Sequence, residues 1–167
     1  MLATGGTAWA LTRAHGSAGA AAVPSSAPAV RRAAAVQADE QCTAEMKKST
    51  RWVCLTKATL HNKTFTLWYE AEWHGSRPDI EHGFHLHIYG SDGTSPDEST
   101  MGSQAVKHSK YYFEDQEPSV RKTSDPDFEA IGDAKKVCAR IAHSGHGLAP
   151  AYDGGYHTGN CIPIQRY

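Results

Sequence analysis

The segment Lys63–Trp73 (KTFTLWYEAEW) carries the clearest alternation of side-chain character in this chain of 167 residues. Apolar residues stand at every second position, and most of the residues between them are Thr or Glu. Because successive side chains of a β-strand point to opposite faces, this pattern predicts a half-buried strand. Residues 51–60 resemble a partner strand and residues 61–63 a turn. The segment therefore predicts an antiparallel hairpin.

A second strand is predicted at Phe84–Tyr89 (FHLHIY). Its three apolar residues at alternate positions point to one face, so His85 and His87 share the other face. Two shorter strands are expected at Tyr111–Phe113 and Ile162–Gln165. Most of the predicted sheet is thus assembled from short segments that follow the first hairpin.

From about residue 128 onward, apolar residues recur every three or four positions, which is typical of one face of a helix. These residues are Phe128, Ile131, Ala134, Cys138 and Ile141. Basic side chains come later in the segment, where the helix dipole favours them. We therefore predict a helix over residues 133–143, and an α+β fold with an antiparallel, sandwich-like β-sheet and one C-terminal helix.

The chain has four widely spaced cysteines: Cys42, Cys54, Cys138 and Cys161. They lack the close C-x-x-C pairs of structural zinc sites, and an even number at wide spacing predicts two disulfides. Three pairings are possible. The favoured one joins Cys42 to Cys54 and Cys138 to Cys161, because local pairs close at the least entropic cost. The alternative is four buried free thiols in a reducing compartment.

The chain divides into three parts by composition. Residues 1–15 are mainly apolar but too short to span a bilayer, and we interpret them as the remnant of a signal peptide or signal anchor. Residues 16–39 are rich in Ala and Pro and predict a disordered linker. Residues 40–167 form the disulfide-stapled globular domain. Together with the cysteines, this organisation predicts an extracytoplasmic protein, either secreted or anchored to the cell membrane through its N-terminus.

Charge excludes one class of partner. The 17 basic and 18 acidic residues are scattered along the chain, so no basic patch for nucleic acid is expected. Ten histidines are many for this length, and all but His15 lie after the linker. Since histidine is both a metal ligand and a pH-responsive group, either role is open.

The His-x-His pair, His85 and His87, is the sharpest chemical feature. Two imidazoles side by side on one strand face can jointly bind copper or zinc, but two ligands seldom suffice. Further ligands are expected among His143, His108 and His157, and His82 and His146 also qualify by residue type. The sequence thus predicts an extracytoplasmic domain that binds a transition metal.

The same residues allow a second interpretation. A His-x-His pair can also be an exposed strand face or a hydrogen-bonded pair in a polar core. In that case the chain is a non-enzymatic sensor or interaction domain at the cell surface, with an unknown ligand and with structural or pH-responsive histidines. A third His or Asp ligand close to the pair would favour the metal.

Residues 83–93, GFHLHIYGSDG, resemble the first signature of the copper/zinc superoxide dismutases. That resemblance implies that His85 and His87 bind copper on a β-barrel strand and that the copper dismutates superoxide. His143 is similar to the family's late copper ligand, and Cys161 to its C-terminal cysteine. The family's zinc ligands follow the signature as a histidine cluster, whereas residues 88–142 here hold one histidine, His108.

As a whole, the chain is similar in style to uncharacterised secreted or membrane-tethered proteins of high-GC actinobacteria, in which an Ala/Pro-rich spacer precedes a cysteine-stapled domain. This similarity implies a location outside the cytoplasm and no particular activity.

Overall fold

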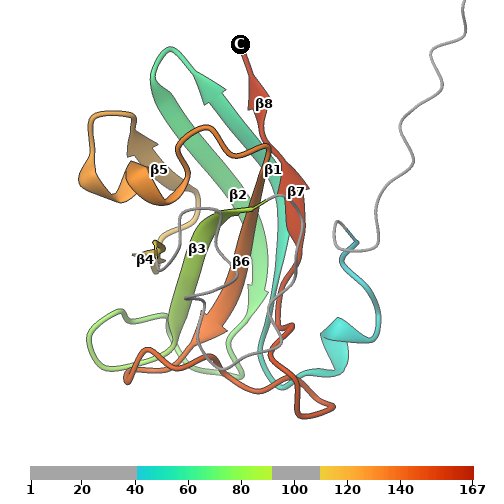
Figure 1. Cartoon of the computed structure of the whole chain (residues 1–167). Helices are drawn as coiled ribbons and strands as arrows, with labels where there is room; N and C mark the ends of the chain where they lie inside the picture. Colours follow the sequence, from blue (N-terminus) through green and yellow to red (C-terminus); the bar gives the residue numbers. More distant parts are fainter. Residues whose placement is uncertain (1–40, 92–109) are drawn as a thin grey trace, which may run out of the picture. The chain divides into compact units, whose positions relative to one another are not determined.

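The computed structural model describes residues 41–91 and 110–167, which lie in one compact unit, Ala35–Tyr167. Two four-stranded β-sheets form this part of the chain (Figure 1). The predicted signal remnant at residues 1–15 and the predicted linker at residues 16–39 lie outside the described residues, as does His108. These three expectations stay predictions.

The first sheet contains the predicted hairpin. Its strands are β1 (Trp52–His61), β2 (Thr64–Glu72), β5 (Ser119–Lys122) and β8 (Gln165–Arg166). They lie in the order β5-β2-β1-β8, in which β1 and β5 are both antiparallel to β2, and β8 runs parallel to β1. The prediction of a hairpin over residues 51–73 is confirmed.

The second sheet is antiparallel throughout and holds the His-x-His strand. Its strands are β3 (His85–Ser91), β4 (Tyr112–Glu114), β6 (Lys136–Ala142) and β7 (Cys161–Pro163). They lie in the order β4-β3-β6-β7. Two short 3-10 helices, η2 (Met46–Lys48) and η3 (Pro126–Ala130), complete the regular structure of the described residues. No helix in these ranges is long and apolar enough to cross a membrane.

The hydrophobic core is built by both sheets. Alternate residues of each long strand contribute side chains that are almost completely buried, among them Val53, Leu55, Phe65, Leu67, Leu86, Ile88, Val137, Ala139 and Ile141. This is the burial expected when two sheets pack face to face. The antiparallel, sandwich-like part of the predicted fold is therefore confirmed, and the described residues are mostly β.

The segment that leads into β7 connects the two sheets through buried hydrogen bonds. Asn160 presents its side-chain amide to β1: Oδ1 accepts from Leu55 N–H at 2.7 Å, and Nδ2 donates to Leu55 C=O at 3.2 Å. Thr158 binds both sheets, because its carbonyl accepts from Val53 N–H at 2.8 Å and its hydroxyl accepts from Ile141 N–H at 2.9 Å. Residues 158–160 thus satisfy backbone groups that the ladders leave unpaired.

Both disulfides of the favoured pairing are present. Cys42 is bonded to Cys54 and fixes the segment before β1, while Cys138 is bonded to Cys161 and joins β6 to β7. No cysteine is left as a free thiol. Two disulfides are consistent with an extracellular location, since reducing compartments seldom preserve them.

The predicted helix at residues 133–143 is wrong. Residues Lys136–Ala142 form β6, whose seven residues are all buried. Val137, Ala139 and Ile141 point into the core at the spacing of a strand. The helical spacing arose because it combined buried residues in and next to η3 with Cys138 and Ile141, which lie on opposite faces of a strand that is buried on both.

The hairpin turn places two ordinary residues in a left-handed conformation. Asn62 has φ 47° and Lys63 has φ 64°. Two successive positive φ angles between antiparallel strands are the geometry of a type I′ turn, which favours Asn followed by Gly. Lys63 therefore occupies a position that suits glycine.

Replacing Lys63 with glycine is expected to raise the free energy of unfolding by about 0.5–1 kcal/mol, because it removes the steric cost of the left-handed conformation. Urea denaturation would measure the change. Lys57→Gly, at an exposed position within β1, is the matched control and is expected to destabilise the protein by a similar amount. An equal loss of stability in both variants would contradict the prediction.

Candidate metal centre

β3 supplies two buried histidines on the face that points away from the core. Leu86 and Ile88 turn into the core, so the strand's period of two directs His85 and His87 to the other side of the sheet. There His87 lies opposite Arg140 of β6. His85 is 0% exposed and His87 is 1% exposed. The predicted shared face is confirmed, and it is covered rather than open to solvent.

A third histidine comes from the loop after β6. The loop is closed by two backbone hydrogen bonds, His146 N–H to His143 C=O at 2.8 Å and His143 N–H to Gly147 C=O at 3.1 Å. His146 has φ 60°, a left-handed conformation that few non-glycine residues adopt. This tight loop carries the exposed His146 back over β3, where its ring lies 5.2 Å from that of His85.

The three imidazoles converge on one point. His85 Nε2 lies 3.3 Å from His87 Nε2 and 3.3 Å from His146 Nδ1. One ring nitrogen from each histidine lies within 4.8 Å of the other two. Nitrogen ligands at about 2.0–2.1 Å from a tetrahedral ion are about 3.3–3.4 Å apart. Two of the three separations therefore already match those of ligands around one ion.

Burial keeps the two strand histidines neutral. Desolvation, together with the neighbouring imidazoles of His85 and His146, lowers the pKa of His87 to about 3. Desolvation is also the main cause of the lowered pKa of His85. His87 Nδ1 is buried and has no hydrogen-bond partner among the described residues. Neutral imidazoles are the form that binds a metal, so these two histidines can bind a cation without first releasing protons.

Aromatic rings enclose the group on one side. Tyr111 stacks on His87 with ring centroids 4.5 Å apart, and Phe113 stacks on His146 at 4.4 Å. The Phe113 ring also meets the edge of His85 at 5.3 Å. These contacts limit the rotation of the imidazoles and exclude water from part of the site. The predicted strand at Tyr111–Phe113 is confirmed as β4, but the sequence did not indicate this second role.

The other predicted ligands lie elsewhere. The imidazole of His143 is outside the group and lines a separate pocket. His157 Nε2 lies 3.2 Å from Asp153 Oδ2, and His82 is an exposed residue near Asp79 and Glu81. His108 is outside the described residues. Among the other histidines considered as ligands, the structure brings His146 close to His85 and His87.

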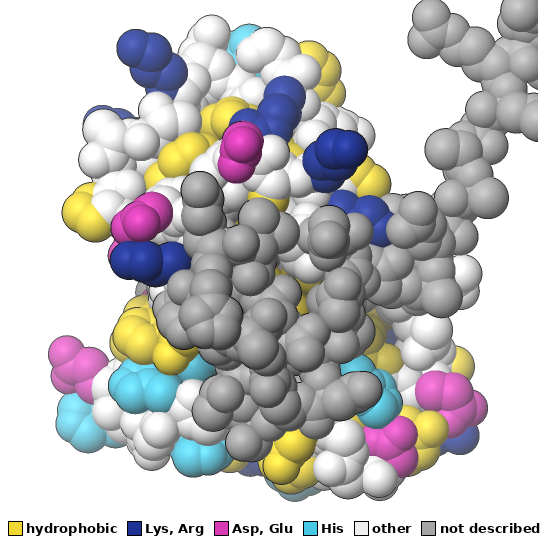
Figure 2. Space-filling model, viewed as in Figure 1, with side chains coloured by type: hydrophobic (Ala, Val, Ile, Leu, Met, Phe, Trp, Pro, Cys, Tyr) yellow, Lys and Arg dark blue, Asp and Glu magenta, His cyan; other side chains and the backbone are white. Residues whose placement is uncertain are grey.

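Histidine side chains gather at the lower end of the face shown in Figure 2, beside hydrophobic side chains. In Figure 1 that end carries the start of β3 and the end of β6. The three converging histidines come from these two strand ends, which the register places side by side because His85 lies opposite Ala142. Sheet pairing therefore brings together residues that are about sixty positions apart in sequence.

The fold and this group define a class of protein: a disulfide-linked domain of two β-sheets with a candidate three-histidine metal centre. Searches against protein families, curated proteins and solved structures found no match for the chain.

Proposed function

We propose that this protein is an extracytoplasmic domain that binds one transition-metal ion through His85, His87 and His146. The observation that carries the proposal is the convergence of three imidazole nitrogens, two pairs of which are 3.3 Å apart. The low pKa values of His85 and His87 support it, because neutral imidazole is the ligand form.

The donor set favours copper or zinc. Three neutral nitrogen ligands suit both ions, whereas magnesium and calcium prefer oxygen. Three protein ligands also leave a coordination position for water or a small molecule, as in catalytic metal sites. Copper is the ion implied by the resemblance of residues 83–93 to the copper/zinc superoxide dismutase signature. We therefore expect copper to bind more tightly than zinc.

The location is part of the proposal. Two disulfides support a site of action in an oxidising compartment, and the composition of residues 1–39 favours export. We propose that the domain is secreted or is tethered to the outer face of the cell membrane by the N-terminal part of the chain.

Metal binding is tested by loading the protein with copper or zinc. The metal-free full chain is incubated with copper or zinc, excess ion is removed, and the metal bound per chain is measured by mass spectrometry. The wild-type protein is expected to retain about one ion per chain. The His85→Ala/His87→Ala double variant should retain none, and His146→Ala should lower the affinity at least about tenfold.

His157→Ala is the matched control, because His157 is a partly exposed histidine outside the group. It should load like the wild type. His146 is the most informative position, since its exposed side chain can be removed without opening the core. Equal loading of the wild type and the His146→Ala variant would show that His146 is not a ligand. If the wild type binds no metal, the metal-binding proposal fails, and the alternative of a non-enzymatic sensor or interaction domain remains.

Superoxide dismutation is the activity that the resemblance implies, and it is tested after binding. A bound copper ion would supply one-electron chemistry at the position left open by the three histidines. Copper-loaded protein should consume superoxide faster than zinc-loaded protein, and the His146→Ala variant should be slower. If copper-loaded and zinc-loaded protein are equally inactive, the site binds metal without this catalysis.

A further inference from the structure

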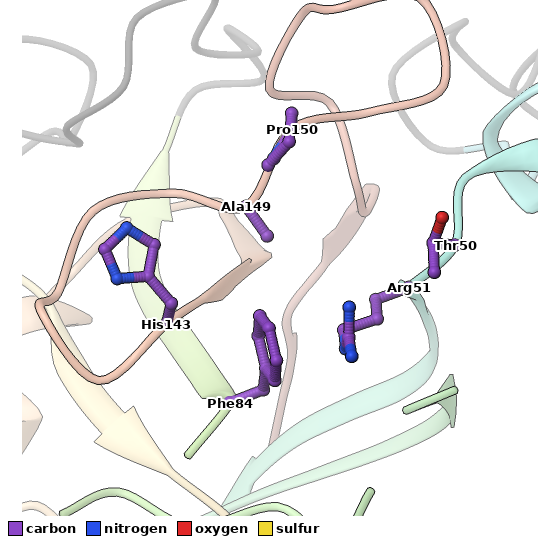
Figure 3. Close-up of a pocket in the computed structure, with 6 residues that line it drawn as sticks. All are labelled: Thr50, Arg51, Phe84, His143, Ala149 and Pro150. Atoms are coloured by element: carbon purple, nitrogen blue, oxygen red, sulfur yellow. The ribbon is translucent and has the colours of Figure 1, made fainter. Parts of the chain in front are cut away.

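A pocket with a cavity volume of about 380 Å³ lies beside the histidine group. Its lining residues are Thr50, Arg51, Phe84, His143, Ala149 and Pro150. In Figure 3 Phe84 lies between His143 and Arg51, and Ala149 and Pro150 lie above it. Phe84 immediately precedes His85, and His143 belongs to the loop that carries His146. The pocket and the histidine group therefore share two chain segments but not their side chains.

Among the described residues of this lining, Arg51 is the one with a permanent charge. Its guanidinium carbon lies 3.6 Å from the centre of the Phe84 ring, so the ring fixes the guanidinium plane. Arg51 forms no ion pair with any described residue, and its buried Nε has no hydrogen-bond partner among them. A buried polar group without a partner is uncommon and calls for an explanation.

The remaining walls restrict the ligand further. Phe84, Ala149 and Pro150 present carbon surfaces, and Thr50 adds a hydroxyl group. A mostly apolar cavity with a few polar groups is typical of small-molecule sites, and about 380 Å³ is near the lower end of their size range. Arg51 supplies one positive charge and a planar fork of donors, which matches a carboxylate.

We propose that this pocket binds a small organic carboxylate. Its carboxylate pairs with the guanidinium of Arg51 and accepts a hydrogen bond from the Thr50 hydroxyl, and its apolar body packs against Phe84, Ala149 and Pro150. The planar fork of an arginine holds a carboxylate through two parallel hydrogen bonds, which no lysine reproduces. The site requires no metal and stands independently of the proposed metal centre.

The test uses benzoate and its neutral analogue benzamide with the metal-free full chain in the presence of a chelator. Amide chemical shifts in two-dimensional NMR spectra report both the position and the affinity of binding. Benzoate should shift the amides of residues 50, 51, 84, 143 and 149. Benzamide should bind at least about tenfold more weakly, because it cannot form the charge-assisted hydrogen bonds.

Arg51→Gln should weaken benzoate binding at least about tenfold and leave benzamide unchanged. Arg77→Gln, at an exposed arginine outside the pocket, is the matched control and should bind benzoate like the wild type. Equal affinity for benzoate and benzamide in the wild-type protein would overturn the proposal, and this comparison does not depend on the folding of a variant. Tighter binding of phenyl phosphate than of benzoate, or no shift at millimolar benzoate, would also overturn it.

Discussion

In the metal-free protein, His87 alone is expected to remove about 4 kcal/mol from the free energy of unfolding as the pH falls from 6.5 to 3. In the folded protein burial holds the pKa of His87 at about 3, whereas an unfolded chain restores a value near 6.5. Between these two values the unfolded state takes up a proton that the folded state does not. Its contribution to stability is therefore complete above pH 6.5 and is lost progressively toward pH 3.

This loss should be large enough to lower the midpoint of the cooperative unfolding transition between pH 6.5 and 3. Domains of this size have a total stability of about 5–15 kcal/mol. His85 acts in the same direction, because its pKa is also lowered by desolvation. Chemical denaturation at several pH values, with a chelator present, measures the dependence.

The comparison that isolates His87 is the slope of stability against pH. His87→Leu removes the titrating group while filling similar space beside Tyr111 and Phe113, so its slope between pH 6.5 and 3 should be shallower. A His87→Leu variant with the same slope as the wild type would show that His87 is protonated in the folded protein.

The second large effect is expected at Asn160. Replacing it with leucine keeps the branched shape of the side chain but leaves the N–H and C=O groups of Leu55 buried without their partners. Each unpaired group costs about 1–3 kcal/mol, so the free energy of unfolding should fall by about 2–6 kcal/mol. Thermal and urea unfolding of the purified variant measure this loss.

Thr158→Val provides a graded control. It removes the hydroxyl that accepts from Ile141 N–H but keeps the carbonyl that binds Val53, so it leaves one buried group unpaired where Asn160→Leu leaves two. The free energy of unfolding should therefore fall about half as much in Thr158→Val as in Asn160→Leu. If Asn160→Leu is no more destabilising than Thr158→Val, the side-chain amide of Asn160 is not what secures β1.

The elements that could be predicted from the sequence are those whose two faces differ. β2 alternates between core and surface, and the inner residues of β3 alternate with histidines, so the period of two is visible in each. β6 is buried on both faces, and the face opposite the core mixes the charged Lys136 and Arg140 with Cys138 and Ala142, so no uniformly polar face reveals its period. Its residues Cys138 and Ile141 instead matched a helical spacing, which produced the wrong helix.

The candidate site was predictable only to the extent that it is local. His85 and His87 are neighbours on one strand, so strand geometry alone places them together. His146 reaches them through the pairing of β3 with β6 and through a left-handed backbone conformation, neither of which is marked in the sequence. Once β6 was taken as a helix, the position of the loop after it could not be inferred.

The origin of the three histidines divides the site into a fixed part and an exchangeable part. Two donors are built into a central strand whose opposite face is core, so they cannot change without cost to folding. The third donor is carried by residues 143–147, a five-residue loop closed by its own hydrogen bonds. Loop grafting at this position would therefore exchange one ligand while the framework stays intact, which makes the domain a scaffold for engineering metal preference.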